Sequence, residues 1–307
     1  MDSIRLKSCA TIANLSCGFD VLGLCINEPY DEIIISKNSD RIIKLEILES
    51  LYDDIPSDVN QNTGGVPAQL ILEDLKLDFG FNVQIKKGIP LCGGLGSSAA
   101  TAVGVVFGIN QLLNQELNIK QMLHYALEGE KVSVTNPHLD NIAPCLLGGL
   151  TLIKDTNSLE VIKIPISDFY IVAIHPNIKI STQDARDILP DKILLSSAIK
   201  QWGSLSSLVY AFSNNNLDLI KSSMHDYIVE PLRKNLIKGF DQIKHNALDM
   251  GALGCSISGS GPTIFALCET KKIAEDIGKY SNDYYHSINL DSDIYISNIN
   301  TVGPQII

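Results

Sequence analysis

The chain has 307 residues, which is enough for two domains or one large one and for a sizeable hydrophobic core. Hydrophobic residues make up 45% and charged residues 19% of it, as is usual in a soluble globular protein. The formal net charge of −11 argues against a nucleic-acid or anionic-membrane partner. Any anion must therefore be bound locally, by backbone amides, a few aligned cations or a metal ion.

Seven cysteines are scattered along the chain without a C-x-x-C pair. This pattern is typical of a reduced compartment, and not of a disulfide framework or a zinc site. The first residues lack the apolar core of a signal peptide, and no stretch approaches the roughly 20 apolar residues that span a bilayer. We therefore expect a soluble, cytoplasmic protein with no membrane partner.

Strand patterns open the chain. The apolar runs around 33–35 and 43–47 flank Asn38-Ser39-Asp40, a pattern that predicts a hairpin. Residues 81–87 predict another strand, which leads directly into a glycine-rich loop. The apolar spacing of residues 97–113 then predicts a buried helix with a serine at its N-cap, and residues 120–132 predict a second helix.

The later elements are strands over 150–153 and 170–174, followed by a mostly helical half. Its clearest helices are expected at 217–225 and 236–250, before a second glycine cluster and a strand over 263–267. This alternation indicates an α+β or α/β chain. We place a boundary near residue 165, between domains of residues 1–165 and 166–307.

The stretch from Gly93 to Ser98, read between a strand and a helix, is typical of a loop that points backbone N–H groups at an anion. It is neither a dinucleotide fingerprint nor the common phosphate loop, because no lysine follows its glycines. A simple turn with a serine N-cap would explain the glycines alone. The Ser97-Ser98 pair favours a ligand, since one hydroxyl can cap the helix while the other stays free for a metal.

Three ordered sequence motifs, at residues 10–23, 90–100 and 254–262, resemble the signatures of the GHMP kinase superfamily. The second one reads P-x-x-x-G-L-G-S-S-A-A. The resemblance spans essentially the whole chain. It implies a two-domain α+β fold, with a ribosomal-S5-like N-terminal domain that binds ATP and a ferredoxin-like C-terminal domain. It also implies ATP and Mg²⁺ as cofactors.

Four further stretches resemble the branch of that superfamily whose acceptor is L-homoserine. They are the pattern A-N-x-x-x-G-F-D and residues 138–144, 181–190 and 230–233. The resemblance implies an ATP-dependent phosphotransferase of threonine biosynthesis that forms O-phospho-L-homoserine, and it implies a homodimer. Two alternatives stay open: another small-molecule GHMP kinase, acting on mevalonate, a sugar or shikimate, and a non-catalytic sensor of ATP and a metabolite.

The resemblance implies that Ser98 and Glu130 hold the metal. Glu128 is a nearby competitor, and Lys131 stands where the family normally has glycine, but the spacing back from His138 favours Glu130. The implied nucleotide-binding residues are Asn62, Pro90, Gly93, Gly94, Leu95, Gly96, Ser97, Ser98 and Ala99.

The acceptor's carboxylate is best matched by the planar fork of arginine, and its ammonium by a carboxylate. The residues implied for this site are Arg186, Arg233, Asp20, Asn14, His138, Asp140 and Asn141. The two arginines together with the acidic Asp20 favour a zwitterionic amino acid as the acceptor over mevalonate, a sugar or shikimate.

Catalysis is expected to proceed without a dedicated protein base. Related kinases of the superfamily place an aspartate near residue 141 and a lysine in the first motif. This chain has Asn141 and no Lys or Arg between Lys7 and Lys37. An amide cannot accept a proton at neutral pH. Asn14 and Asn141 would orient the hydroxyl, although Asp140 is adjacent and a base there is not excluded.

The adenine contacts are ambiguous from the sequence. Asn62 resembles the purine-contacting asparagine of the family, but it is equally well explained as a turn residue before Gly64-Gly65. Lys86 and Lys87 precede the glycine loop, and we expect both to face solvent.

Overall fold

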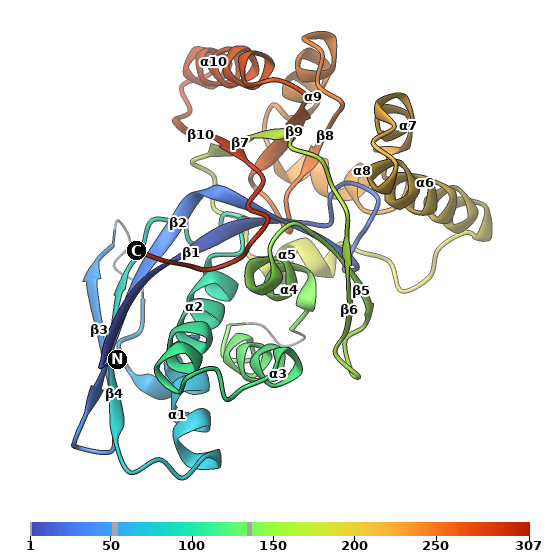
Figure 1. Ribbon diagram of the computed structural model, residues 1–307. Coiled ribbons are helices and arrows are strands. Elements are labelled where there is room, and N and C mark those ends of the chain that lie inside the picture. The colour runs from blue at the N-terminus through green and yellow to red at the C-terminus, as the bar shows by residue number, and fades with distance from the viewer. Residues whose placement is uncertain (1, 51–54, 134–136) are drawn as a thin grey trace.

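The computed structural model describes residues 2–50, 55–133 and 137–307 (Figure 1). The chain is α+β and contains two sheets. The elements of its first part are β1 (Ser3–Ala13), β2 (Leu22–Asn38), β3 (Ile43–Glu49), α1 (Gly65–Asp74), β4 (Gly80–Lys86), α2 (Ser97–Leu112), α3 (Ile119–Glu130), α4 (Leu139–Leu147), β5 (Leu150–Asp155) and β6 (Glu160–Ile164).

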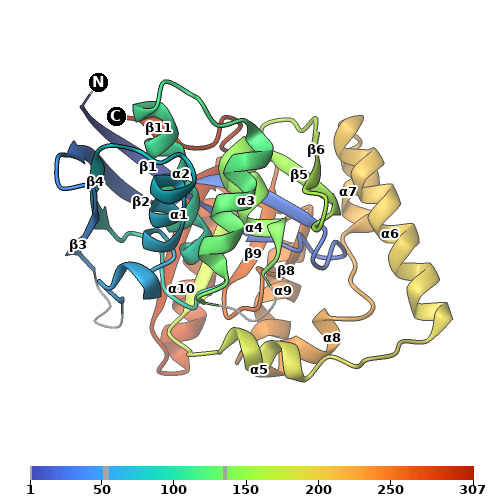
Figure 2. The same ribbon diagram turned by 90° about the horizontal axis from the view of Figure 1, so that it is seen from below.

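The first sheet has the order β11-β1-β2-β4-β3, and β5 and β6 extend it from the other end of the long strand β2. Helices α1 to α4 gather on one side of it (Figures 1 and 2). Alternate side chains of its strands, such as Leu6, Ile33, Ile35 and Phe81, are fully buried beneath those helices. The sequence predictions for β4, α2, α3 and β5 are therefore confirmed, within one to two residues at most ends.

The predicted hairpin over 33–47 is wrong. Strand β3 does not pair with β2, because β4 lies between them, antiparallel to β2 and parallel to β3. The side chains of Phe81, Val83 and Ile85 on β4 are buried. A strand this apolar buries more surface between two partners than at an edge, so β4 occupies the interior and β3 the sheet's end.

The second part contains β7 (Tyr170–Pro176), α5 (Thr182–Asp187), α6 (Leu195–Ser213), α7 (Leu217–Ser223), α8 (Glu230–Arg233), α9 (Phe240–Asp249), β8 (Gly254–Ile257), β9 (Ile264–Cys268), α10 (Lys271–Ser287), β10 (Ser292–Asn298) and β11 (Gln305–Ile306). Its sheet is antiparallel in the order β10-β7-β9-β8, the ferredoxin-like arrangement. Helices α9 and α10 cover one face (Figure 1). Helix α9 begins later than expected because Gly239 precedes it in a left-handed conformation.

The two sheets divide between Ile164, where β6 ends, and Tyr170, where β7 begins. The chain then returns, since β11 pairs with β1 and Ile26 bridges to Ile299. The boundary near residue 165 stays a prediction about domains. Among the described residues, no helix is long and apolar enough to cross a membrane.

Candidate active site

The glycine loop connects β4 to α2 and needs glycine at two positions. Gly94 and Gly96 both have positive φ values, of 77° and 67°. A Cβ atom on Gly96 would lie 2.1 Å from Oγ1 of Thr11, and one on Gly94 would lie 2.3 Å from the carbonyl oxygen of Ser258. Any larger residue would therefore displace the loop from the segments beneath it.

Three segments far apart in the sequence meet at this loop. The amide of Thr11 donates to the carbonyl of Leu95 at 3.1 Å. The hydroxyl of Ser258 donates to the carbonyl of Gly94 at 2.6 Å, and the amide of Gly259 donates to the carbonyl of Ala13 at 3.2 Å. The three sequence motifs are thus joined to one another by hydrogen bonds around one site.

The start of α2 differs from the prediction of a serine N-cap. The N-cap is Gly96, which makes no side-chain capping bond. The hydroxyl of Ser97 instead donates to the carbonyl of Ile89 at 3.1 Å, and that of Ser98 donates to Glu130 at 3.0 Å. Because no side chain caps this 16-residue helix, its first amides and its dipole face the loop, as in anion sites.

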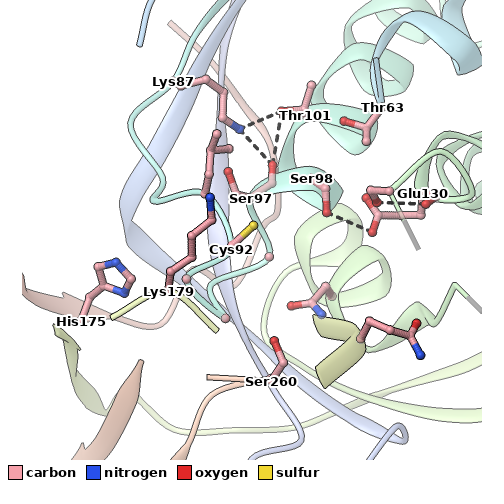
Figure 3. Close-up of a pocket in the computed structure, with 18 of the residues that line it drawn as sticks. Thr63, Lys87, Cys92, Ser97, Ser98, Thr101, Glu130, His175, Lys179 and Ser260 are labelled. Carbon is pink, nitrogen blue, oxygen red and sulfur yellow. Dashed lines mark hydrogen bonds between the residues drawn. The ribbon is translucent and has the colours of Figure 1, made fainter. Parts of the chain in front are cut away.

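Ser98 and Glu130 form the best candidate metal site. Glu130 is the last residue of α3, and Figure 3 shows its carboxylate facing Ser98. Its Oε2 atom accepts the serine hydrogen bond, while its buried Oε1 atom has no partner among the described residues. Burial raises the pKa of Glu130 to about 7. A hard divalent cation would satisfy the orphan oxygen, so these residues fit Mg²⁺.

The competing Glu128 points elsewhere. Its carboxylate accepts a hydrogen bond from Nζ of Lys131 at 2.5 Å. Lys131, the departure from the family pattern, is exposed and therefore places no charge in the metal site. The geometry favours Glu130 over Glu128.

Asp20, His138 and Arg186 form one polar cluster at the other end of the cleft. Nη1 of Arg186 donates to Oδ2 of Asp20 at 2.8 Å, and its Nη2 is hydrogen-bonded to Nε2 of His138. Nδ1 of His138 lies 3.7 Å from the same Asp20 oxygen. Burial lowers the pKa of His138, which keeps its ring neutral at neutral pH.

Arg233 enters the same cluster from α8. Its Nε donates to the carbonyl of Ala185 and its Nη1 to the carbonyl of Gly259, both at 2.9 Å. Burial lowers the pKa of Arg233 to about 10, so it stays charged at neutral pH. The ring of Phe19 lies 5.2 Å from the guanidinium carbon of Arg186 and 5.1 Å from that of Arg233. Phe19 thus holds two cations by cation–π contact. In the sequence, only the position of Phe19 directly before Asp20 in the first motif pointed to this role.

Asn141 is oriented by a residue that the sequence did not single out. The buried hydroxyl of Thr11 donates to Oδ1 of Asn141 at 2.7 Å, so the amide nitrogen turns toward Asp140, 3.4 Å away. Burial, with a smaller contribution from the charge of Asp20, raises the pKa of Asp140 to about 7. A carboxyl with that pKa can exchange protons near neutrality.

Asn14 has most of its amide engaged. Its Oδ1 accepts from the amide of Asp20 at 3.0 Å, and its Nδ2 donates to the carbonyl of Gly259 at 2.9 Å. It therefore links the first and third motifs and leaves one Nδ2 hydrogen for a ligand.

The structure makes Asn62 a turn residue. Its Oδ1 accepts from the amides of Gly64 and Gly65, and its Nδ2 donates to the carbonyl of Pro56 at 2.8 Å. Asn62 also lines the cleft, as the nucleotide-binding prediction requires.

The expectation that Lys86 and Lys87 both face solvent is wrong for Lys87. Lys86 is exposed and paired with Glu49 at 2.6 Å. Lys87 is buried, forms an ion pair with the fully buried Asp31, and donates to the carbonyl of Ser97 at 3.0 Å (Figure 3). Strand alternation turns the two neighbours to opposite sides.

The glycine loop, the Ser98–Glu130 pair and the cluster around Asp20 line one cleft of about 1150 Å³. Most of the predicted site residues line it, on both the loop and the arginine side. Three do not, and they are buried instead: Pro90, Leu95 and Ala99. Only the backbone of these three could reach a nucleotide.

Comparisons with known proteins agree with this arrangement. Residues 66–149 match the model of the GHMP kinases N-terminal domain, and residues 208–286 match that of the GHMP kinases C-terminal domain. A homoserine kinase of Chlorobium phaeobacteroides strain DSM 266 is 36% identical over 320 residues, with all of both chains covered. The chain is a member of the homoserine kinase family.

Two other relatives support the same assignment. A homoserine kinase of Methanococcus vannielii is 40% identical over 274 residues, covering 88% of this chain and 90% of that one. The crystal structure of a homoserine kinase from Cytophaga hutchinsonii is 43% identical, with a TM-score of 0.96 over 100% of this chain and 98% of that one. The GHMP kinase fold expected from the sequence is therefore confirmed.

In this member of the homoserine kinase family, the charged site residues could be predicted from the sequence, but the residues that contact and orient them could not. Thr11 and Phe19 touch predicted site residues and Asp31 pairs with Lys87 beneath the loop, yet each is of a type that is common in ordinary strands and loops. His175 and Lys179 also line the cleft, from the end of β7 and the segment after it. No motif marked them.

Proposed function

We propose that this protein is an ATP-dependent homoserine kinase, which transfers the γ-phosphoryl group of ATP to the hydroxyl of L-homoserine and forms O-phospho-L-homoserine for threonine biosynthesis. The observation that carries the proposal is the composition of the cleft described above. One end holds an uncapped helix start and the Ser98–Glu130 pair, and the other end holds two arginines beside Asp20.

The ion pair between Asp20 and Arg186 supports a zwitterionic acceptor. If the pair opens, both partners need a new counter-charge, because each is only about 30% exposed. An amino acid supplies both at once: its ammonium pairs with Asp20 and its carboxylate with Arg186 and Arg233. Mevalonate and sugars lack the ammonium and would leave Asp20 unpaired. His138, Asn14 and Asp140 complete this pocket.

Ser98 and Glu130 would hold Mg²⁺, which supplies charge neutralisation for the phosphates of ATP. The loop from Gly93 to Ser97 would bind the phosphates through its amides. Phosphoryl transfer passes through a loose transition state, so alignment and electrostatics contribute more than covalent help. Asn62 lines the same cleft, where it would contact the adenine.

We propose that the transfer uses no dedicated protein base. Asn141 and Asn14 orient the acceptor hydroxyl, and its proton leaves late, to a phosphate oxygen or to water. Because Thr11 holds Oδ1 of Asn141, the amide presents its nitrogen, which can donate but cannot accept a proton. General base catalysis typically contributes ~10²–10⁴-fold, so proximity and electrostatics can act without it.

A coupled ADP-release assay tests the function. Homoserine, mevalonate, galactose and shikimate are offered separately with ATP and Mg²⁺, and turnover is expected with homoserine alone. Arg186→Met and Arg233→Met should raise KM for homoserine by about tenfold or more, with KM for ATP unchanged. Preferential turnover of another acceptor would indicate a different GHMP kinase. Tight ATP binding without turnover of any acceptor would indicate a sensor.

We also propose that the enzyme acts in the cytoplasm as a homodimer. All seven cysteines are free thiols, which is compatible with a reducing compartment. Helix α6 presents an exposed apolar stripe, Leu195, Ile199, Trp202 and Tyr210, whose spacing places them on one face.

A second copy fits this stripe better than a charged partner does. Lys200 is the single charged residue of α6, so two copies of a chain with a net charge of −11 can meet there without repulsion. Gly203 has open space above it and would receive the ring of Trp202 from the other copy. Sedimentation should give twice 33.5 kDa for wild type and 33.5 kDa for Trp202→Glu. Ile42→Glu, at another exposed hydrophobic residue outside α6, is the control and should stay dimeric; a monomeric wild type would contradict the dimer.

A further inference from the structure

The glycine loop lacks a lysine, and the chain as a whole is strongly acidic, so the triphosphate needs a cation from elsewhere. The basic side chains that line the cleft within the described residues are Lys87, Lys179, Arg186, Arg233, His138 and His175. Their partners in the structure separate them into those already engaged and those available to a new anion.

Most of these groups are engaged. Lys87 is paired with Asp31, Arg186 with Asp20, and Arg233 with two backbone carbonyls at the acceptor end. Burial lowers the pKa of His175, whose Nδ1 is hydrogen-bonded to Thr263 at 3.0 Å, so it is neutral at neutral pH. Burial likewise lowers the pKa of His138. None of these is a free cation beside the loop.

Lys179 is different. Its side chain is exposed, and it forms no ion pair with a carboxylate of the ranges that the structure describes. Figure 3 shows its side chain extending from the segment after β7 toward the glycine loop, near Cys92. Asp291 and Asp293 line the same cleft and are exposed, so an anion entering there meets repulsion that a lysine would offset.

Two groups of the second sheet's neighbourhood, His175 and Thr263, lie against the loop. A Cβ atom on Gly93 would lie only 3.1 Å from Cε1 of His175, and the amide of Thr263 donates to the carbonyl of Gly93 at 3.2 Å. After β7, Ile180 is buried in the second hydrophobic core and Ile178 packs against it. Lys179 lies between these two buried or half-buried isoleucines, and its own side chain faces the cleft instead of the core.

We propose that Lys179 binds the polyphosphate of ATP and supplies the positive charge that the glycine loop lacks. The inference rests on the proposed function, since it assumes that ATP is the ligand of this loop. It makes the second sheet a participant in nucleotide binding: the amides of the loop hold the phosphates from one side and the Lys179 ammonium holds them from the other. Because the lysine is exposed, its contact should weaken at high ionic strength.

Nucleotide binding measured by calorimetry without an acceptor tests this. Wild type, Lys179→Met, Lys179→Arg and Lys279→Met are each titrated with AMP, ADP and a non-hydrolysable ATP analogue. Lys279 is an exposed lysine of α10 that does not line the cleft, so it is the matched control. Lys179→Met should lower the affinity for the ATP analogue by about tenfold and the affinity for AMP by less than about twofold, because a charge-assisted contact to phosphate is lost. Lys179→Arg should retain most of the affinity.

Equal affinities of Lys179→Met and wild type for the ATP analogue would overturn the proposal, as would an equal loss for AMP and the analogue. A second readout is the dependence of affinity on salt, which should be shallower for Lys179→Met than for wild type and for Lys279→Met. The measurement uses no homoserine. A wild type that binds ATP but phosphorylates no acceptor would therefore refute the proposed kinase and leave the assignment of Lys179 standing.

Discussion

The buried ion pair beneath the glycine loop makes the strongest single prediction about stability. Asp31 is fully buried, and its carboxylate accepts from the amides of Gly88 at 3.0 Å and Ile89 at 3.1 Å as well as from Lys87. Lys87 in turn donates to the carbonyl of Ser97 and to the hydroxyl of Thr101 at 2.9 Å. The pair therefore ties the beginning of the loop to the first turn of α2.

Replacement of Lys87 by methionine should lower the free energy of unfolding by about 3–5 kcal/mol, because it leaves a buried carboxylate without its counter-charge. For a chain of this length, that is a fall in Tm of roughly 6–10 °C, at about 2 °C per kcal/mol. The double variant Lys87→Met/Asp31→Asn should recover most of the loss. Its asparagine can still accept from both loop amides, and no buried charge remains.

Calorimetric Tm and the urea midpoint measure these differences, and KM for ATP reports on the loop. Lys86→Met is the control, since Lys86 is exposed and its surface pair with Glu49 is worth less than about 1 kcal/mol. The prediction is refuted if the free energy of unfolding of Lys87→Met lies within about 1 kcal/mol of the wild-type value. It fails equally if the double variant is less stable than Lys87→Met alone.

Three other predictions concern the reaction and its pH dependence. Asn141→Asp should not raise kcat, because no base is needed at this position; a large gain that titrates near the pKa of an aspartate in a kcat–pH profile would contradict base-free transfer. Ser98→Ala and Glu130→Gln should each lower kcat/KM by about 10²-fold or more and raise the Mg²⁺ concentration for half-maximal rate, while AMP binding stays unchanged; an unaltered Mg²⁺ dependence would remove them from the metal site. Asp140→Asn should stabilise the protein at pH 8 by up to about 4 kcal/mol and change little at pH 4, as measured by urea unfolding. The sign follows from the raised pKa: between its ordinary value of 3.8 and about 7, the folded state keeps a proton that the unfolded state has lost, so stability falls as pH rises through that window. A variant that is less stable than wild type at pH 8 would contradict this.

The parts of the fold that could be predicted from the sequence depend on local patterns. Helix α2 and strand β4 were recognised from apolar spacing, and the position of Glu130 near the end of α3 followed from the length of that helix. The pairing of β3 could not be predicted in this way. Asn38-Ser39-Asp40 permits a turn, but the partner of a strand depends on which neighbour buries more apolar surface.

The candidate site shows the same division. Asp20, Arg186 and Arg233 were identified from their motifs, but the ion pair between Asp20 and Arg186 and the shared contact with Phe19 depend on segments more than 160 residues apart in the sequence. The serine N-cap was wrong because tertiary partners, Ile89 and Glu130, take the two hydroxyls that local rules assign to the helix end.

The sequence by itself determined which side chains this protein has to offer: a glycine loop without lysine, a serine and a glutamate that we predict hold a metal, and two arginines with an aspartate that we predict bind a zwitterion. Residue types and short spacings carry that information, because backbone conformation and side-chain chemistry are local properties. The tertiary structure alone decided which of these groups are engaged. Burial pairs Lys87 with Asp31 and orients Asn141 through Thr11, while Lys179 lines the cleft without an ion pair to any carboxylate in the described part of the chain. Burial and long-range hydrogen bonds are set by the packing of the two sheets.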